Sequence, residues 1–410
     1  MINKLLKFIY FLIPYICVLI GLEIILRFTN LNPYQVPVYP YDYFEKNDIY
    51  GYDIKKDKKR KKFSSNEYSF DVWGNDIGCF DYPINNLKDG YILLVGASVT
   101  WGFVPLKYNY GTVLENKLNN TRILKCGVPG FSLKQKFLKT TNIIKKLEKK
   151  PKLIIFVYSF PTDLRGDYLF PQYKVENNIL TTNKVISSFE TGEIQLRKDS
   201  KKTLSKKIKY LLSQKSYLFR FSHLIHKNLR KKLKNKEKNE NNKNNKNNKN
   251  LLDSFGAGYL SYFDENKMIW VKNIWKEHLQ TLKDFKELAE KNDAGLLAIY
   301  WDDLPDYSAS TLESLINNDF PITLNNNKKV FSFFEEENIN YLNMTEKMFE
   351  HVGYTSILDK RKLLKGTLIY KTNNHPSIEG NNFMGNSIYF KICDNIKLKS
   401  KPLEGCVLLK

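Results

Sequence analysis

The chain has 410 residues, of which 42% are hydrophobic and 14% aromatic, so it is long enough for one large α/β domain with appendages. The formal net charge of +22 is concentrated, because residues 201–250 contain 17 Lys or Arg against two Glu. This run and a second one at residues 55–62 lack the aromatic interleaving and the motifs of nucleic-acid-binding proteins. The sequence therefore predicts no specific nucleic-acid partner. Solvated charge, or contact with anionic lipid or glycan, is the alternative interpretation of both runs.

The five cysteines do not form a metal-binding pattern. None belongs to a Cys-x-x-Cys pair or has a histidine at ligand spacing, so the sequence predicts no metal site. If the body of the chain is exported, Cys393 and Cys406 could pair, although sequence alone does not establish this connectivity.

An apolar segment lies close to the first residue. Residues 8–25 (FIYFLIPYICVLIGLEII) are long enough to cross a bilayer as a helix, in which Pro14 is tolerated as a kink. No small-x-small cleavage site follows, which favours a retained single-pass anchor at residues 1–30 over a removed signal peptide. A buried helix of a soluble domain is the third alternative.

Charges on either side of this segment predict its orientation. Lys4 and Lys7 precede it, whereas only Arg27 follows closely, which favours a cytoplasmic N-terminus and a body that is periplasmic or extracellular. Glu23 stands four residues before Arg27, so we expect the two side chains to pair at the membrane boundary.

Beyond Gly90, short apolar runs alternate with helical stretches. This alternation predicts an α/β fold with a parallel sheet that is covered by helices on both faces. The expected strands and helices are, in turn, strands at residues 91–95, 122–124, 153–158, 296–300 and 339–342, and helices at residues 110–118, 133–149, 267–291 and after Gly380.

Two segments interrupt this alternation. Residues 31–88 lack sustained periodicity, and we interpret them as a spacer and N-terminal extension of irregular structure. Residues 176–265 form a basic insertion, within which the polar low-complexity tract 235–250 is expected to be disordered. The α/β domain then consists of two parts, residues 89–175 and 266–410.

A serine directly follows the first expected strand. Ser98 lies in the sequence Gly96-Ala97-Ser98-Val99-Thr100, at the carboxyl end of a strand, where open parallel sheets bind their ligands. At the start of a following helix, its own backbone N–H would favour a developing oxyanion. Taken alone, such a turn is more often structural than catalytic.

Three other segments strengthen the case for this serine. Together the four segments are Gly96–Gly102, Lys125–Ser132, Ser159–Asp163 and Thr372–Gly380. In this order, and at these ends of their elements, they resemble the four motif blocks of the SGNH (GDSL-like) hydrolases, of which the chain would be a divergent member. The resemblance covers about residues 88–165 and 295–395. It implies a three-layer α/β/α, flavodoxin-like fold with a parallel sheet.

The resemblance also implies roles for individual residues. Ser98 corresponds to the nucleophile and His375, in the sequence Asn374-His375-Pro376, to its base. The oxyanion hole would be formed by Ser98 and Gly130 through their backbone N–H groups and by Thr162 through its hydroxyl. No cofactor is implied, because acyl transfer through a serine needs none.

Three positions depart from the family pattern. Ala97 replaces the Asp beside the nucleophile, Thr162 replaces an oxyanion Asn, and Asn373 or Thr372 stands where an acid would orient the histidine. Loss of one oxyanion donor typically costs about 10²–10³ in rate. An Asp-to-Asn change in a serine protease triad has cost about 10⁴. A slow Ser–His dyad, or a carboxylate from elsewhere in the chain, is compatible with these departures.

Other polar or aromatic residues near the blocks are interpreted structurally. Asp163 is interpreted equally as a structural helix cap and as a site residue. Trp101 is interpreted as a wall or core residue, and the Asp302-Asp303 pair as a helix cap. His223 and His226 lie in the basic insertion, where solvated positions are expected.

The expected function is that of a membrane-anchored serine esterase acting on acyl or acetyl esters, and an exported domain is compatible with a cell-surface glycan as substrate. An O-acyltransferase that passes the acyl group to a glycan hydroxyl is one alternative. The other is a catalytically silent SGNH-like protein that binds glycan or assembles with partners. The sequence does not distinguish these three, and it predicts no oligomeric state.

Overall fold

The computed structural model describes most of the chain. The chain divides into two compact units. The described residues are 2–29, 39–65, 67–84, 87, 90–118, 121–188, 191–197, 208–213, 216–226, 229–230, 263–302, 326–353, 364–371, 373–395 and 406. The anchor unit contains Met1–Tyr41, Lys62–Phe70 and Asp199–Asn248, and the sheet unit contains Asp42–Lys61, Asp71–Lys198 and Lys249–Lys410. The tract 235–250, which the sequence predicts to be disordered, lies outside the described residues.

The anchor unit is helical in its largest described parts. Helix α1 (Ile2–Phe28) contains Pro14, and its residues Tyr10–Phe28 are long and apolar enough to cross a membrane. Glu23 and Arg27 of α1 form the expected ion pair, with 2.8 Å between carboxylate oxygen and guanidinium nitrogen, which confirms that prediction. Two helical segments, 208–213 and 217–226, come from the basic insertion, where no helix was predicted.

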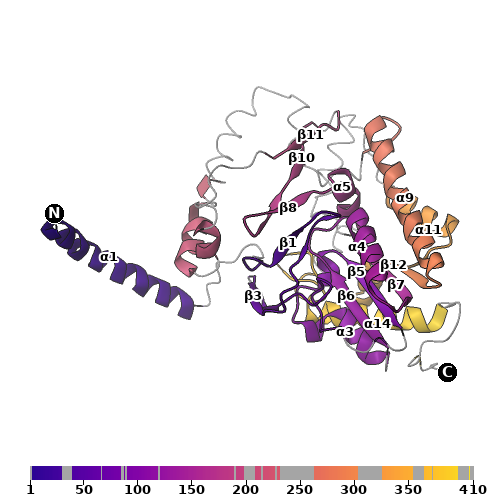
Figure 1. Cartoon of the computed structure of the whole chain (residues 1–410), viewed down its shortest axis with the longest axis horizontal. Coiled ribbons are helices and arrows are strands. Elements are labelled where there is room, and N and C mark those ends of the chain that lie inside the picture. The colour runs from indigo at the N-terminus through magenta and orange to yellow at the C-terminus, as the bar shows by residue number, and fades with distance from the viewer. Residues whose placement is uncertain are drawn as a thin grey trace. The chain divides into compact units, whose positions relative to one another are not determined.

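A five-stranded parallel sheet forms the centre of the sheet unit (Figure 1). Its strands are β5 (Tyr91–Gly96), β6 (Arg122–Gly127), β7 (Pro151–Phe160), β12 (Gly295–Asp302) and β13 (Asn340–Asn343), in the order β13-β12-β7-β5-β6. After β6 the chain crosses to the far side of β5, so the strand order reverses between β5 and β7. This is the flavodoxin-like order, in which ligands bind beyond the strand ends at the reversal.

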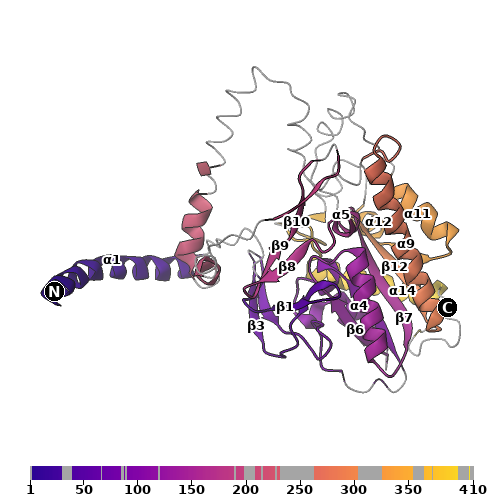
Figure 2. The same cartoon turned by 45° about the horizontal axis from the view of Figure 1, so that its top comes forward.

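Helices cover both faces of this sheet, as expected. Alternate side chains of β5 point to opposite faces, because successive residues of a strand do so. Ile92 and Leu94 pack in one cluster, whereas Leu93 and Val95 pack in the other. The first cluster lies under α3 (Tyr110–Lys117), α12 (Met344–His351) and α14 (Ile378–Asn395), and the second under α4 (Leu133–Lys146), α9 (Ile269–Lys291) and α11 (Asn326–Glu336). Helices α4 and α9 lie side by side in both views (Figures 1 and 2).

The predicted three-layer α/β architecture is therefore confirmed. The expected elements differ at their ends, and α11, α12 and a short helix at Thr162–Tyr168 were not among them. Strand β7 extends from Pro151 to Phe160, two residues further at each end than expected. Helix α4 ends at Lys146, three residues before the expected end.

Short antiparallel strands occur where the sequence predicts only irregular structure or an insertion. They pair as four hairpins, β1 (Phe44–Asn47) with β2 (Gly51–Ile54), β3 (Lys61–Ser64) with β4 (Ser69–Val72), β8 (Tyr173–Glu176) with β9 (Ile179–Thr182), and β10 (Lys184–Ile186) with β11 (Ile194–Leu196). Each strand has three or four residues, too few for an alternating pattern to stand out.

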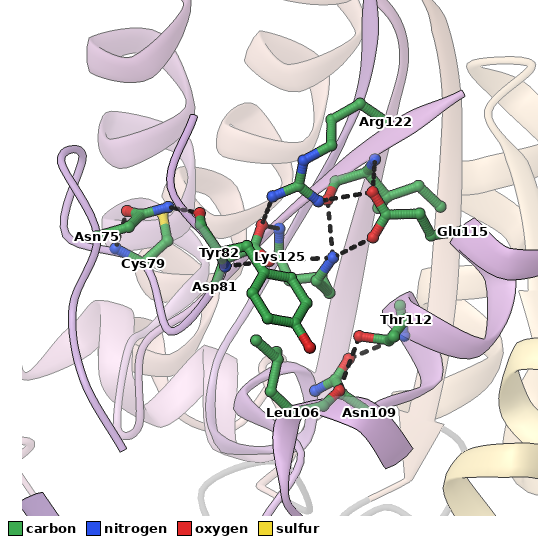
Figure 3. Close-up of polar contacts among 12 residues, drawn as sticks. Asn75, Cys79, Asp81, Tyr82, Leu106, Asn109, Thr112, Glu115, Arg122 and Lys125 are labelled. Carbon is green, nitrogen blue, oxygen red and sulfur yellow. Dashed lines mark hydrogen bonds and ion pairs between the residues drawn. The ribbon is translucent and has the colours of Figure 1, made fainter. Parts of the chain in front are cut away.

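The N-terminal extension is joined to edge strand β6 by a buried ion-pair network (Figure 3). The Asp81 carboxylate lies 2.9 Å from Arg122 and 3.0 Å from Lys125, which is 1% exposed. Glu115 of α3 contacts the same two cations, at 2.7 Å and 2.5 Å. Burial alone would raise the pKa of Glu115, but Lys125 and Arg122 outweigh burial and lower it. Removal of one partner from such a network typically costs about 3–5 kcal/mol.

Two disulfides lie in the sheet unit. Cys79 of the extension is bonded to Cys126 of β6, next to the ion-pair network. Cys393 at the end of α14 is bonded to Cys406, which is the pairing that the sequence left open. Cys17 of α1 is a free, exposed thiol.

Candidate active site

Ser98 is the first residue of a very short helix that follows β5. Helix α2 (Ser98–Trp101) begins two residues after the strand and closes at Gly102, whose φ of 97° favours glycine. At Gly96, a Cβ atom would collide with the Thr100 side chain, so glycine is required there as well. The tight turn leaves Ser98 partly exposed at the carboxyl end of β5.

His375 approaches this serine from the far end of the chain. Its Nε2 lies 2.8 Å from Ser98 Oγ, although 277 positions separate the two residues. It stands just before α14 and keeps some exposed surface. The structure thus brings the two residues of the predicted dyad within hydrogen-bond distance, as a serine and its base require.

Asn373 orients the imidazole from its other nitrogen. Its Oδ1 accepts the backbone N–H of His375 at 2.9 Å and lies 3.0 Å from Nδ1. A backbone N–H can only donate, so the amide must present its oxygen here, and Nδ1 must carry the proton. Nε2 is then free to accept the proton of Ser98 Oγ, which is the tautomer that a general base needs.

The surroundings of His375 disfavour its charged form. Desolvation by burial lowers the pKa of His375 to about 3, because an imidazolium loses more hydration than a neutral ring. The buried Phe103 ring packs against the imidazole, with 3.8 Å between ring centroids and 33° between planes. Phe103 has no counterpart in the predicted site, since no motif marks an aromatic residue as a packing partner. The imidazole is therefore neutral at physiological pH. Its lowered pKa also makes it a weak base.

A buried asparagine links the loop of the base to the turn of the nucleophile. Asn381 of α14 donates from Nδ2 to Gly102 O and Pro376 O, both at 3.2 Å, and its Oδ1 accepts the Tyr110 N–H at 3.1 Å. Its side chain is fully buried. Sequence analysis missed Asn381, because a polar residue in the first turn of a helix is usually solvated.

No protein-family model and no curated protein sequence matches the chain. Several solved structures are similar to it. The chain resembles GDSL-family lipolytic proteins. A member of the lipolytic protein G-D-S-L family from Veillonella parvula DSM 2008 is 11% identical with a TM-score of 0.32, and the match covers 72% of this chain and 94% of that chain.

A second solved structure, of a putative lipolytic protein of the G-D-S-L family from Desulfitobacterium hafniense DCB-2, is 12% identical with a TM-score of 0.33. That match covers 73% of this chain and 98% of the other. At such low identity, the roles of Ser98 and His375 depend on the geometry of this chain alone.

The other residues that the GDSL-like blocks single out lie at neighbouring strand ends. Gly130, with a φ of 81°, is in the turn between β6 and α4. Thr162 is the first residue of α5 (Thr162–Tyr168), just after β7. Because β6 and β7 flank β5 in a parallel sheet, both residues follow the same edge as Ser98. Their part in an oxyanion hole stays a prediction.

Asp163, within the third GDSL-like block, has a structural role. It is fully buried, lies 2.6 Å from Lys136 Nζ, and accepts the Ser159 backbone N–H at 2.8 Å. Lys136 also donates to Val157 O at 2.8 Å. These contacts fix the connection from β7 to α5, and therefore the position of Thr162.

Trp101 is a core residue, since it is 1% exposed and donates from Nε1 to the Tyr43 hydroxyl at 2.8 Å. Asp302 ends β12, and its backbone N–H donates to Thr345 Oγ1 at 2.7 Å, whereas Asp303 lies outside the described residues. His223 and His226 are exposed on the segment 216–226, as interpreted from the sequence.

A hydroxyl–histidine–carboxylate chain, separate from Ser98, His375 and Asn373, lies inside the fold. The Tyr158 hydroxyl is 2.8 Å from His278 Nε2, and Asp167 Oδ2 is 2.6 Å from His278 Nδ1. Tyr158 and His278 are completely buried, so no substrate reaches them. These three residues connect β7, α5 and α9 structurally.

Within the described residues, no group of three or more His, Cys, Asp or Glu side chains is arranged to hold a metal ion.

Proposed function

We propose that the protein is a membrane-anchored serine esterase of the SGNH type that hydrolyses acyl or acetyl esters. The observation that supports this most strongly is the 2.8 Å contact between His375 Nε2 and Ser98 Oγ. It lies at the carboxyl end of β5, beside the reversal of strand order where open α/β sheets bind ligands.

In the proposed reaction, Ser98 Oγ attacks the ester carbonyl carbon while its proton passes to His375 Nε2. The backbone N–H groups of Ser98 and Gly130, with the Thr162 hydroxyl, hold the oxyanion of the tetrahedral intermediate. His375 then gives the proton to the leaving alkoxide, which leaves an acyl-enzyme. Water activated by the same nitrogen cleaves the acyl-enzyme, releases the carboxylic acid and restores Ser98.

The environment of His375 predicts that this reaction is slow. Asn373 fixes the tautomer, but a neutral amide stabilises the imidazolium less than a carboxylate does. The desolvation that lowers the pKa of His375 acts in the same direction. The general base is therefore correctly placed and weakly basic.

The location that we propose is a membrane, with the sheet unit on the periplasmic or external side. Helix α1 is long and apolar enough to span the bilayer. The disulfides Cys79–Cys126 and Cys393–Cys406 support an exported sheet unit, because structural disulfides persist mainly in oxidising compartments. Acyl esters of cell-surface glycans are substrates compatible with this location. Transfer to a glycan hydroxyl would use the same acyl-enzyme.

A catalytically silent SGNH-like protein, which binds glycan or assembles with partners, is the second candidate. Asn373 in the orienting position favours it, because the pair Ser98–His375 then has no carboxylate at Nδ1. Ala97 and Thr162, which replace motif residues, point the same way.

Hydrolysis of a small aryl acetate distinguishes the two candidates. We expect slow turnover by the parent, none by Ser98→Ala, and parental turnover by Ser222→Ala, which removes an exposed hydroxyl of the anchor unit. Addition of an acceptor sugar then separates transfer from hydrolysis by the products formed. Turnover that persists in Ser98→Ala, or that is absent from the parent, contradicts the esterase assignment.

A further inference from the structure

Glu23 of α1 caps a helix that comes from the distant basic insertion. Its Oε1 accepts the Tyr217 N–H at 3.0 Å, and its Oε2 accepts the Leu218 N–H at 2.9 Å and the Ser216 hydroxyl at 2.8 Å. The first N–H groups of a helix have no partner inside that helix, and the helix dipole favours an anion at this end. Glu23 therefore fastens segment 216–226 to α1.

The same contact explains how an acidic residue is accommodated in an apolar helix. A carboxylate near the bilayer is costly unless it is paired. Arg27 pairs with Glu23 at 2.8 Å, and its guanidinium lies 5.4 Å from the centroid of the Tyr217 ring. Arg220 approaches the same ring, at 5.0 Å. The junction of the two helices is thus a layer of paired charges and one aromatic ring at the C-terminal end of α1.

Among the described residues of the insertion between 208 and 230, four large apolar side chains are exposed. Ile208 and Leu212 are 48% and 40% exposed, and Ile225 and Leu229 are 46% and 55% exposed. Ile208 and Leu212 are four residues apart in the helical segment 208–213, which places both on one side of that helix. Large apolar side chains exposed in this way are characteristic of contact with a membrane or a partner.

The charge of the insertion indicates whether its exposed apolar side chains contact a membrane or a partner protein. Residues 201–234 contain 12 Lys or Arg and no Asp or Glu. A basic helix with exposed apolar residues is typical of segments that lie in the membrane interface. Each Lys or Arg near an anionic leaflet contributes about 1 kcal/mol of attraction. Because α1 already brings the insertion to the bilayer, anionic phospholipid is the complementary partner.

We propose that the described segments 208–213, 216–226 and 229–230 form an interfacial clamp, which lies in the headgroup region of the leaflet at the C-terminal end of α1. Ile208, Leu212, Ile225 and Leu229 enter the acyl boundary, and the exposed side chains of Lys209 and Arg230 contact anionic phospholipid headgroups. Glu23 holds the clamp at a fixed depth relative to α1. The clamp rests on the proposed membrane anchor and is independent of the esterase chemistry.

Spin labels on the full-length chain in vesicles test this proposal. One label is placed by Ile225→Cys and a matched one by His223→Cys, each with Cys17→Ser. The other four cysteines are in disulfides. Both positions are exposed, and they point about 200° apart around the helix axis. In vesicles containing phosphatidylglycerol, the ratio of oxygen to nickel-chelate collision rates should be several-fold higher at position 225 than at position 223. Equal ratios, with both labels in water, would overturn the clamp.

The native Cys17 separates failure of the clamp from failure of the anchor. A label on Cys17 reports whether α1 lies in the bilayer, since this exposed thiol is inside the apolar span. Oxygen access without nickel access at Cys17, combined with a water-exposed position 225, refutes the clamp and leaves the anchor intact. Water access at all three positions refutes both.

Two further comparisons test the roles of Glu23 and of the charge. Glu23→Gln should increase nickel access at position 225 several-fold, whereas Glu193→Gln, at an exposed site of the sheet unit, should not. An unchanged value in Glu23→Gln would contradict the proposed fastening. Removal of phosphatidylglycerol should also raise nickel access at position 225. A label that responds to soluble heparin and not to phosphatidylglycerol would assign the surface to a soluble polyanion and overturn the proposal.

Discussion

The amide oxygen of Asn373 lies 3.0 Å from His375 Nδ1, the ring nitrogen that faces away from Ser98. In a serine triad, one carboxylate both orients the histidine and stabilises the imidazolium. Here the orientation is present, because the amide accepts the Nδ1 proton, but the negative charge is missing. The two contributions of the third triad residue are therefore separated in this chain and can be measured independently.

Restoring the charge should accelerate ester hydrolysis. We expect Asn373→Asp to raise kcat for a small aryl acetate by about 10²–10⁴, since the reverse change in a serine protease cost about 10⁴. Asn374→Asp adds the same charge one residue further along and should leave kcat within a few-fold of the parent. Equal gains from both substitutions would indicate a general electrostatic effect. Thr372, the other position considered for an acid, lies outside the described residues.

The pH dependence of the same variant provides a second prediction. Only the neutral imidazole can act as a base, and the pKa of His375 is lowered to about 3 by burial. The acid limb of the parental rate profile should thus lie near that value. A carboxylate at Nδ1 favours the imidazolium, so Asn373→Asp should move the acid limb to higher pH. A limb that moves downward, or stays in place while kcat rises, would contradict this account of the base.

Folding stability should also depend on the protonation of His375. Its pKa is about 3 in the folded chain and 6.5 ordinarily, so the unfolded chain binds more protons between these values. The contribution of His375 to the unfolding free energy is complete above about pH 6.5 and is lost as pH falls toward about 3. Between about pH 8 and 5, the melting temperature of the parent should fall more than that of His375→Gln. Parallel curves for the two proteins would argue against a buried neutral imidazole.

Asn381 should act as a positioning residue. Asn381→Ala leaves the Tyr110 N–H and the Gly102 carbonyl without this partner in a buried place, which typically costs about 1–3 kcal/mol. We expect a lower unfolding free energy, together with a lower kcat and an almost unchanged KM. The adjacent Asn382 is exposed, so Asn382→Ala is the matched control. Loss of stability without any change in kcat would show that Asn381 supports the fold only.

The sequence predicted those parts of the structure that depend on local pattern. The apolar run of β5 is long enough to identify a buried strand, and the order of the motif blocks points to Ser98 and His375 before any contact is known. In contrast, Phe103 and Asn381 act through packing and hydrogen bonds between segments that lie far apart in the chain. Neither contact leaves a periodic or spacing signal in the sequence.

The basic insertion also has a long-range contact that could not be predicted from local sequence. Its charge is obvious from composition, and the pairing of Glu23 with Arg27 follows from their spacing of four residues. That Glu23 also caps segment 216–226 depends on a contact between residues almost 200 positions apart, for which no local rule exists. Tertiary structure alone shows that Asp199–Asn248 of the insertion belong with α1 in the anchor unit.

Reaction with a fluorophosphonate tests the central claim most directly, because the reagent is attacked by an activated serine and does not depend on the natural substrate. Ser98 Oγ would displace fluoride from phosphorus while His375 takes the proton, which leaves a stable adduct. Peptide mapping by mass spectrometry should find one modified serine, Ser98, in the parent, slower labelling in His375→Ala and faster labelling in Asn373→Asp. An unmodified Ser98 in both the parent and Asn373→Asp, or labelling that persists unchanged in His375→Ala, would contradict the proposed dyad.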